Sequence, residues 1–153
     1  MKKKLPMMVL ISSPRMRRRE ASDLEEMFDC GLERLHLRKP DHSAKEVSKI
    51  LDKLPERYLN KIVLHRLPEL LKKYPVAGYH HSSVESLLQV EGTSSRSFHK
   101  LSHLRENSEA LDYAFFGPVY NSISKQGYGP KVSMVDVRDY FAEDKEGKHP
   151  AVF

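Results

Sequence analysis

Cysteine is almost missing from this chain, which has a single one, Cys30, among 153 residues. A disulfide needs two cysteines, so a disulfide-stapled secreted fold is excluded within one chain. Because Cys30 stands among Met27, Phe28 and Leu32, we predict that it is a small buried hydrophobic residue. The lack of disulfides fits a reducing compartment, and we expect a cytoplasmic protein.

Long apolar runs are also missing, and a bilayer-spanning helix needs about 20 such residues. The opening MKKKLPMMVLISS has the charged start and apolar middle of a signal peptide, but its apolar run is short and RMRRRE follows. A buried strand over residues 7–12 is the preferred interpretation, and no membrane partner is expected.

Charge is plentiful, with a formal net charge of +5 alongside 39% apolar residues. The apolar share is enough for the core of one domain. A basic chain can bind nucleic acid through phosphates, but only Arg15 and Arg17 to Arg19 form a dense cluster, and no aromatic side chains interleave with them. We interpret this cluster first as a solvated loop before a helix, second as an anion site and last as a nucleic-acid site. No nucleic-acid partner is expected.

Short apolar runs alternate with amphipathic stretches along the chain. Two capping boxes, Ser22 to Glu25 and Ser43 to Glu46, predict helix starts, and Gly31 predicts a helix stop. The strands are predicted at 7–12, 35–37, 62–64, 76–79, 95–98 and 113–116. Helices are predicted from Ser22 to Gly31 and from Ser43 to Leu54, and at 67–74, 83–90, 101–111 and 134–141.

This alternation predicts an α/β fold of right-handed βαβ units with a parallel sheet. The spacing of roughly 20–25 residues per unit is typical of a TIM (β/α)8 barrel, which takes about 250 residues. The chain holds about six βα units plus the start of a seventh strand in HPAVF. We therefore predict a single domain over residues 1–153, an incomplete barrel lacking its C-terminal end.

Polar residues follow several predicted strands, at the end where ligands bind in parallel α/β folds. Arg38 and Lys39 leave the second strand and could hold an anionic substrate, or they could be ordinary polar residues of a surface loop. His65, His80 and His81 follow the third and fourth strands and raise the question of a metal. Adjacent residues of a strand point to opposite faces, so a structural role is preferred for each histidine.

The segment from Gly117 to Gly127 offers backbone amides, hydroxyls and a lysine directly after an apolar strand. Such a set can bind phosphate oxygens.

Three segments together, LHLRKP, Ser97-Phe98-His99 and DYAFFGPVYNSISKQG, resemble the thiamine phosphate synthase family, which also contains the thiazole tautomerases. The resemblance implies a transferase of thiamine biosynthesis that joins hydroxymethylpyrimidine diphosphate to thiazole phosphate and releases pyrophosphate with the help of Mg²⁺. It also implies that the carbon–oxygen bond breaks largely before the thiazole nitrogen attacks. Catalysis of such a step depends on positioning and on cations near the leaving group.

The resemblance also implies the site residues. The family's Q-x-R-x-K segment falls on residues 36–40, so that Arg38 matches its arginine, His36 stands in place of the glutamine, and Lys39 lies one position before its lysine. The residues implied to bind substrate are His36, Arg38, Lys39, Ser97, Ser122, Ser124 and Lys125. Arg38 and Lys125 are the implied catalytic cations. Ser97 is implied to lie near the pyrimidine, and Ser122 and Ser124 near the thiazole phosphate.

The chain also departs from the family's pattern. The Asn-Asp pair expected after the third strand is Leu64-His65, which suits Mg²⁺ poorly. Glu85 is a candidate for a second metal-binding carboxylate, or Mg²⁺ could be held chiefly by the substrate's diphosphate. Pro118 stands where the tautomerase branch has a histidine, which favours the synthase branch over a thiazole tautomerase-like isomerase.

The family's last glycines and strand would lie beyond Phe153, so we expect a shortened relative that a second copy could complete as a homo-oligomer. The open alternative is a non-catalytic or regulatory phosphate-binding relative.

Overall fold

A computed structural model of the chain describes residues 6–123, 126–143 and 150–153. The chain divides into two compact units, the first made of Met1–Ser82 with Leu88–Ser94 and the second of Ser83–Leu87 with Ser95–Phe153. In the part of the chain that is described, no helix is both long and apolar enough to cross a membrane.

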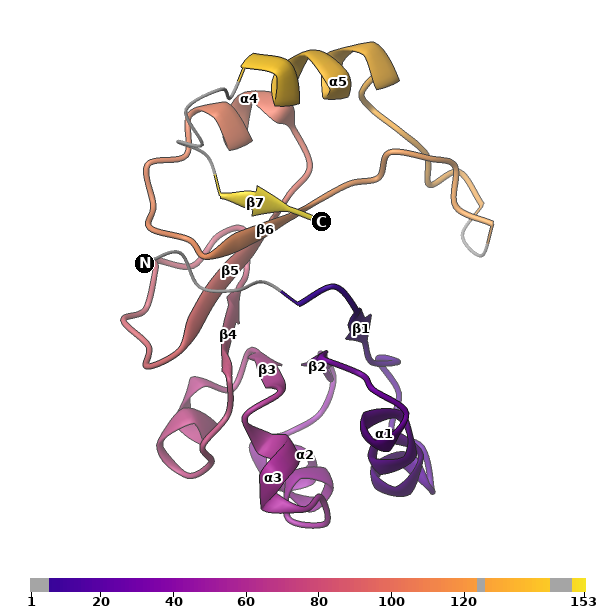
Figure 1. Cartoon of the computed structure of the whole chain (residues 1–153), viewed down its shortest axis with the longest axis vertical. Helices are drawn as coiled ribbons and strands as arrows, with labels where there is room; N and C mark the ends of the chain where they lie inside the picture. The colour runs from indigo at the N-terminus through magenta and orange to yellow at the C-terminus, as the bar shows by residue number, and fades with distance from the viewer. Residues whose placement is uncertain (1–5, 124–125, 144–149) are drawn as a thin grey trace. The chain divides into compact units, whose positions relative to one another are not determined.

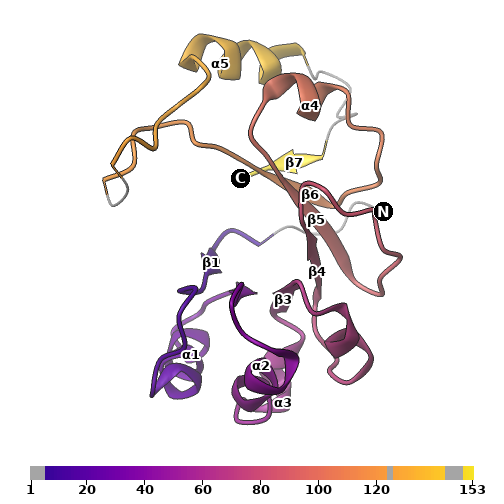
Figure 2. The ribbon, with the colours of Figure 1, turned by 180° about the vertical axis from the view of Figure 1, so that it is seen from behind.

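The first unit is a parallel sheet with helices between its strands. Its strands pair in parallel in chain order, β1 (Val9–Ile11), β2 (Arg34–Arg38), β3 (Ile62–His65) and β4 (Gly78–His81). Its helices are α1 (Glu20–Asp29), α2 (Ala44–Leu51), α3 (Glu56–Leu59) and the 3-10 helix η1 (Pro68–Lys72). Figures 1 and 2 show α1, α2 and α3 on the same side of β1, β2 and β3.

The period of two along each strand decides which side chains meet the helices. Leu35 and Leu37 of β2, together with Ile62 and Leu64 of β3, are buried in one apolar cluster with residues of the helices. The residues between them, including His36, point to the opposite face of the sheet. This second face carries the polar side chains described below.

Helix α1 begins two residues earlier than Ser22, so the predicted capping box there is wrong. The carboxylate of Glu20 instead accepts the N–H of Arg17 at 3.2 Å, which fixes the turn that enters the helix. The predicted stop at Gly31 is confirmed: Gly31 has φ +103° and its N–H donates to the carbonyl of Phe28 at 3.1 Å. The next N–H, from Leu32, donates to the carbonyl of Met27 at 3.0 Å, which completes a Schellman motif.

At the end of α1, Cys30 is exposed, so the prediction that it is buried is wrong. Cys30 is the C-terminal cap of α1, whereas Leu24 and Phe28 form the buried face of that helix. Its apolar neighbours in sequence therefore do not surround it in space.

Helix α2 begins as predicted. Ser43 accepts the N–H of Glu46, and the Glu46 carboxylate accepts the N–H of Ser43 at 2.9 Å, so both halves of the capping box are present. Val47, Ile50 and Leu51 form its buried face. The short helix α3, which follows Pro55, was not predicted.

The second unit contains β5 (Thr93–Phe98), whose first two residues belong to the first unit, β6 (Tyr113–Phe116) and β7 (Ala151–Val152), paired in parallel. Its helices α4 (Leu101–Arg105) and α5 (Met134–Glu143) lie side by side in Figures 1 and 2. Leu101, Leu104 and Tyr140 pack in the core of this unit. Residues 83–90 are not helical, and α4 is shorter than the helix predicted over 101–111.

The predicted α/β class is confirmed, since parallel strands alternate with helices in both units. The incomplete (β/α)8 barrel and the single-domain organisation stay predictions.

Candidate metal and anion sites at the strand ends

Arg38 ends β2 with an exposed side chain on an anchored backbone. The hydroxyl of Ser12, which follows β1, accepts the N–H of Arg38 at 2.9 Å and donates to its carbonyl at 3.2 Å. Two residues after Arg38, the carbonyl of Pro40 accepts a hydrogen bond from Arg66 at 3.1 Å, which holds the turn that leaves the strand. An exposed guanidinium at the carboxyl end of a parallel strand is well placed to bind an anion.

Lys39 has a different environment from Arg38, because the next residue of an extended chain points the other way. Its ammonium forms an ion pair with Glu20 in which the two side chains are 1% and 6% exposed. It also donates to the carbonyls of Ser13 and Arg15 at 2.7 Å and 2.9 Å. Lys39 therefore holds the segment between β1 and α1, and the substrate-binding role expected for it does not fit this placement.

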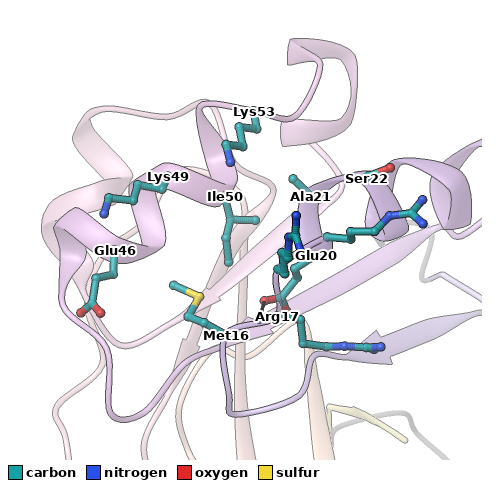
Figure 3. Close-up of a pocket in the computed structure, with 11 residues that line it drawn as sticks. Met16, Arg17, Glu20, Ala21, Ser22, Glu46, Lys49, Ile50 and Lys53 are labelled. Atoms are coloured by element: carbon teal, nitrogen blue, oxygen red, sulfur yellow. Dashed lines mark hydrogen bonds between the residues drawn. The ribbon is translucent and has the colours of Figure 1, made fainter.

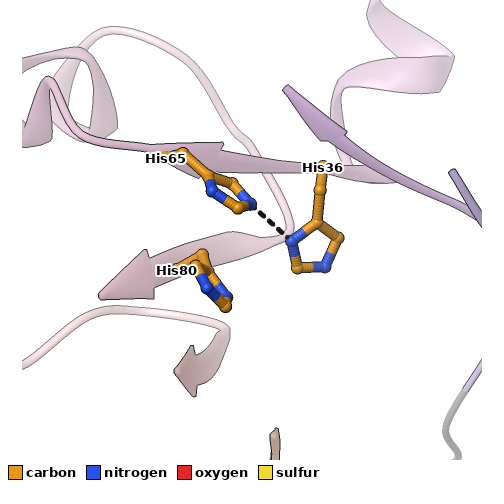
Figure 4. Close-up of side chains that lie close together, drawn as sticks. All are labelled: His36, His65 and His80. Atoms are coloured by element: carbon orange, nitrogen blue, oxygen red, sulfur yellow. Dashed lines mark hydrogen bonds between the residues drawn. The ribbon is translucent and has the colours of Figure 1, made fainter. Parts of the chain in front are cut away.

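Three histidines meet on the face of the sheet that points away from the helices. His36 of β2, His65 of β3 and His80 of β4 point toward one another (Figure 4), and one ring nitrogen from each lies within 4.8 Å of the others. Nδ1 of His36 and Nε2 of His65 are 2.8 Å apart, a hydrogen-bond distance. We call this group the three-histidine cluster. His36, expected to bind substrate, is a fully buried member of it.

Burial keeps the imidazoles of His36 and His65 neutral. It lowers the pKa of His36 to about 3, with the imidazole of His80 and the guanidinium of Arg34 adding to the effect. Burial also lowers the pKa of His65 strongly, helped by His80, His36 and Arg38. Neutral imidazole is the form that can donate a lone pair to a metal ion.

His81 points away from the cluster, as its position next to His80 predicts. Its Nε2 accepts the N–H of Leu88 at 3.0 Å, and its Nδ1 lies 3.4 Å from the hydroxyl of Ser94. The structural role predicted for His81 therefore fits its contacts. For His65 and His80 the sequence interpretation missed their convergence with His36, because that depends on the register of neighbouring strands.

The remaining predicted site residues belong to the second unit. Ser97 lies half-buried on β5 opposite Phe115, and the N–H of Ser122 donates to the carbonyl of Tyr128 at 2.8 Å. Ser124 and Lys125 lie outside the described residues, so their predicted roles stay predictions. Glu85 is half-buried, its carbonyl accepts a hydrogen bond from Arg96 at 2.9 Å, and it is not a member of the three-histidine cluster.

A separate basic pocket lies on the helix side of the first unit, between α2 and the segment that enters α1 (Figure 3). Its volume is about 450 Å³. Its cationic lining residues are Arg17, Arg18, Arg19, Lys49 and Lys53. Part of the arginine cluster of the sequence therefore lines a concave surface, which favours its second interpretation, anion binding.

Comparison with known proteins gives a match among solved structures. No protein-family model matches the chain, and no curated protein matches it. Among solved structures, the thiamine phosphate pyrophosphorylase from Bacteroides thetaiotaomicron is similar, with a TM-score of 0.74 and 23% sequence identity. The match covers 89% of this chain and 66% of that protein. The chain therefore has the α/β fold of that enzyme over about two thirds of the enzyme's length.

The ligand set of the described residues does not suit Mg²⁺. Mg²⁺ prefers oxygen ligands in octahedral geometry, whereas the one group of potential metal ligands found among the described residues consists of three imidazoles. His65 occupies a position where the sequence resemblance implies an aspartate. We therefore assign Mg²⁺ no protein ligands in the described part of the chain.

Proposed function

We propose that this chain is a thiamine phosphate synthase-like transferase that couples hydroxymethylpyrimidine diphosphate to thiazole phosphate. In this reaction the bond between the pyrimidine methylene carbon and the diphosphate oxygen breaks, and that oxygen keeps the electron pair. The thiazole nitrogen then forms the new bond to the carbon, and pyrophosphate leaves. The similar fold of a thiamine phosphate pyrophosphorylase supports the proposal.

The observation that carries the proposal is the position of Arg38. Its guanidinium is exposed at the carboxyl end of β2. Its backbone N–H and carbonyl both form hydrogen bonds with the hydroxyl of Ser12. A planar cation in that place can form two hydrogen bonds to phosphate oxygens of the departing diphosphate, and the negative charge there grows as the bond breaks. The family resemblance implies substrate-binding roles for Ser97, Ser122, Ser124 and Lys125 as well, and these roles stay predictions. Mg²⁺ would arrive bound to the diphosphate.

The test is an assay of the purified 153-residue chain with both phosphorylated substrates and Mg²⁺, with thiamine phosphate as the measured product. Removing one charged donor from a developing anion typically costs about 100- to 1,000-fold in rate, and we expect that loss for Arg38→Gln. Arg138→Gln on α5, where the arginine is exposed and paired with its neighbour Asp139, is the matched control and should keep full activity. Absence of product from the unmodified chain at every Mg²⁺ concentration would overturn the proposal.

A second candidate is a non-catalytic phosphate-binding relative, which is favoured by the basic pocket lined by Arg17, Lys49 and Lys53 among others. Calorimetry with inorganic phosphate and pyrophosphate separates it from the transferase. The second candidate predicts heat of binding that Lys49→Ala and Lys53→Ala reduce, with no turnover of the two substrates. Salt should weaken such binding, because the pocket's cations are exposed.

A further inference from the structure

We propose that the three-histidine cluster binds one divalent transition-metal ion of the zinc type, with His36, His65 and His80 each supplying one ring nitrogen. The site lies wholly within the first unit. It does not rest on the proposed transferase function, because its argument uses only the geometry and chemistry of these three side chains.

The backbone places the three rings on one face by strand register. His65 lies opposite His80 on the neighbouring parallel strand, and Arg38 lies opposite His65 on the other side. Because His36 precedes Arg38 by two residues on β2, it points to the same face as Arg38. Adjacent strands are about 4.8 Å apart, so side chains of neighbouring strands on this face lie within reach of one another, and the three rings do converge. Three paired strands make a rigid support for a metal site.

The distances suit a small cation after a modest adjustment. In tetrahedral coordination with zinc–nitrogen bonds of about 2.0–2.1 Å, ligand nitrogens lie about 3.3 Å apart. The observed pair from His36 and His65 is 2.8 Å apart, and the nitrogens of all three lie within 4.8 Å. Rotating the imidazoles about their side-chain bonds opens the close pair by about half an ångström and draws in the third ring.

The chemistry of the ligands selects the metal. Imidazole nitrogen suits zinc, copper, nickel and iron, whereas Mg²⁺ and Ca²⁺ prefer oxygen. Three protein ligands leave the fourth position of a tetrahedron for water or substrate, the pattern of catalytic rather than structural zinc. Arg38 extends from the same face of the sheet and its charge acts on His65. An anion bound to the metal would therefore have a cation beside it.

The hydrogen bond between His36 and His65 offers a simpler role, in which the rings only satisfy each other inside the fold. The two roles differ in one observable. A structural pair predicts that changing a histidine alters stability alone, whereas a metal site predicts saturable binding of one ion that needs all three rings.

The experiment uses the full chain, stripped with a chelator, dialysed and titrated with Co²⁺, whose visible absorption reports tetrahedral coordination. We expect one equivalent to bind, Zn²⁺ to displace it, and millimolar Mg²⁺ to leave it bound. His65→Gln and His80→Gln should each weaken Co²⁺ binding by about 100-fold or more, since even losing an outer-shell partner costs about 10- to 100-fold. His103→Gln removes an exposed histidine of α4 and should leave binding unchanged.

Two results would overturn the site: no tetrahedral Co²⁺ spectrum from the unmodified chain, or equal affinity in the unmodified chain, His65→Gln and His80→Gln. X-ray absorption of the zinc-loaded unmodified chain keeps the test decisive if the variants fold poorly. Three imidazole ligands are expected there, and a shell of oxygen atoms alone would reject the proposal. The transferase assay, run with Mg²⁺ on the stripped chain, reads out the proposed function separately.

Discussion

At the scale of single residues, Lys39 illustrates how much one step along a strand matters. Arg38 is exposed at the strand end, whereas the ammonium of Lys39 is buried against Glu20. Removing one partner of a buried ion pair leaves the other charge without compensation, which typically costs about 3–5 kcal/mol. We predict that Lys39→Met lowers the free energy of unfolding by about that amount, measured by urea denaturation.

Two further variants make the prediction specific to the ion pair. The double change Lys39→Met with Glu20→Gln should recover much of the loss, because no unpaired buried charge remains. Lys45→Met, at an exposed position of α2, should stay within about 0.5 kcal/mol of the unmodified chain. Equal losses at Lys39 and Lys45 would contradict the buried pair.

Residue patterns in the sequence predicted part of the candidate site. The polar end of LHLRKP placed Arg38 at a strand end, where the structure has it, and the adjacency of His80 and His81 predicted their opposite directions. The burial of Lys39 and the meeting of His36 with His65 were not predictable in this way. Both depend on partners 19 to 29 residues distant in the chain, which only strand register and helix packing bring near.

At the scale of elements, the capping box of α2 gives a prediction about pH. Hydrogen bonds from the backbone and hydroxyl of Ser43 lower the pKa of Glu46 to about 2, with a smaller effect from His42. A carboxyl group whose pKa is depressed by folding contributes stability above its ordinary pKa of 4.5 and loses that contribution as pH falls toward 2. We predict that the stability difference between the unmodified chain and Glu46→Gln shrinks over this range.

The measurement is thermal unfolding of both proteins at steps from pH 6 to about pH 3, in buffers of equal ionic strength. Comparing the two proteins removes the effect of all other titrating groups, since those groups are shared. A difference in Tm that stays constant across the range would show that the carboxylate contributes nothing through its charge.

Gly78, at the start of β4, has no space for a larger side chain. A Cβ atom added to Gly78 would lie 2.0 Å from the carbonyl oxygen of Thr93 and 2.7 Å from its nitrogen, both backbone atoms that cannot rotate away. We predict that Gly78→Ala lowers the free energy of unfolding by about 3 kcal/mol. Gly31→Ala is the control with open space around it, and its positive φ of +103° should cost only about 1–2 kcal/mol. The reverse order of the two losses would contradict the close approach.

Regular patterns predicted the elements better than their ends. Periods of two and of 3.6 residues identified β2, β3, β6 and α2, where local preference and burial agree. The start of the first helix was misplaced because Ser22 and Glu25 have the form of a capping box. The helix instead begins at Glu20, whose carboxylate accepts the N–H of Arg17 and pairs with Lys39. Segment 83–90 has a weak helical pattern and is not a helix, since no strong apolar face holds it in that form.

At the scale of the whole molecule, alternating strands and helices limit where chemistry can occur. The strands of each unit run in parallel, so their carboxyl ends and the polar residues that follow lie at the same end of the strands in that unit. Arg38 and the three-histidine cluster lie toward that end in the first unit, whereas Ser97 and Ser122 belong to the second unit. The likeness to a thiamine phosphate pyrophosphorylase supports the fold that creates this arrangement.

Metal binding should also be visible in the stability of the whole chain. An ion that binds only the folded state at 100 times its Kd adds about 2.7 kcal/mol, which for a chain of this size corresponds to a rise in Tm of about 5–10 °C. We predict that rise for Zn²⁺ with the stripped chain and with His103→Gln, and little or none with His65→Gln. Hydrogen exchange then locates the effect: amides of β2, β3 and β4 should exchange more slowly with Zn²⁺, because each of these strands supplies one ligand. Zinc that slows exchange equally in His65→Gln must bind somewhere else.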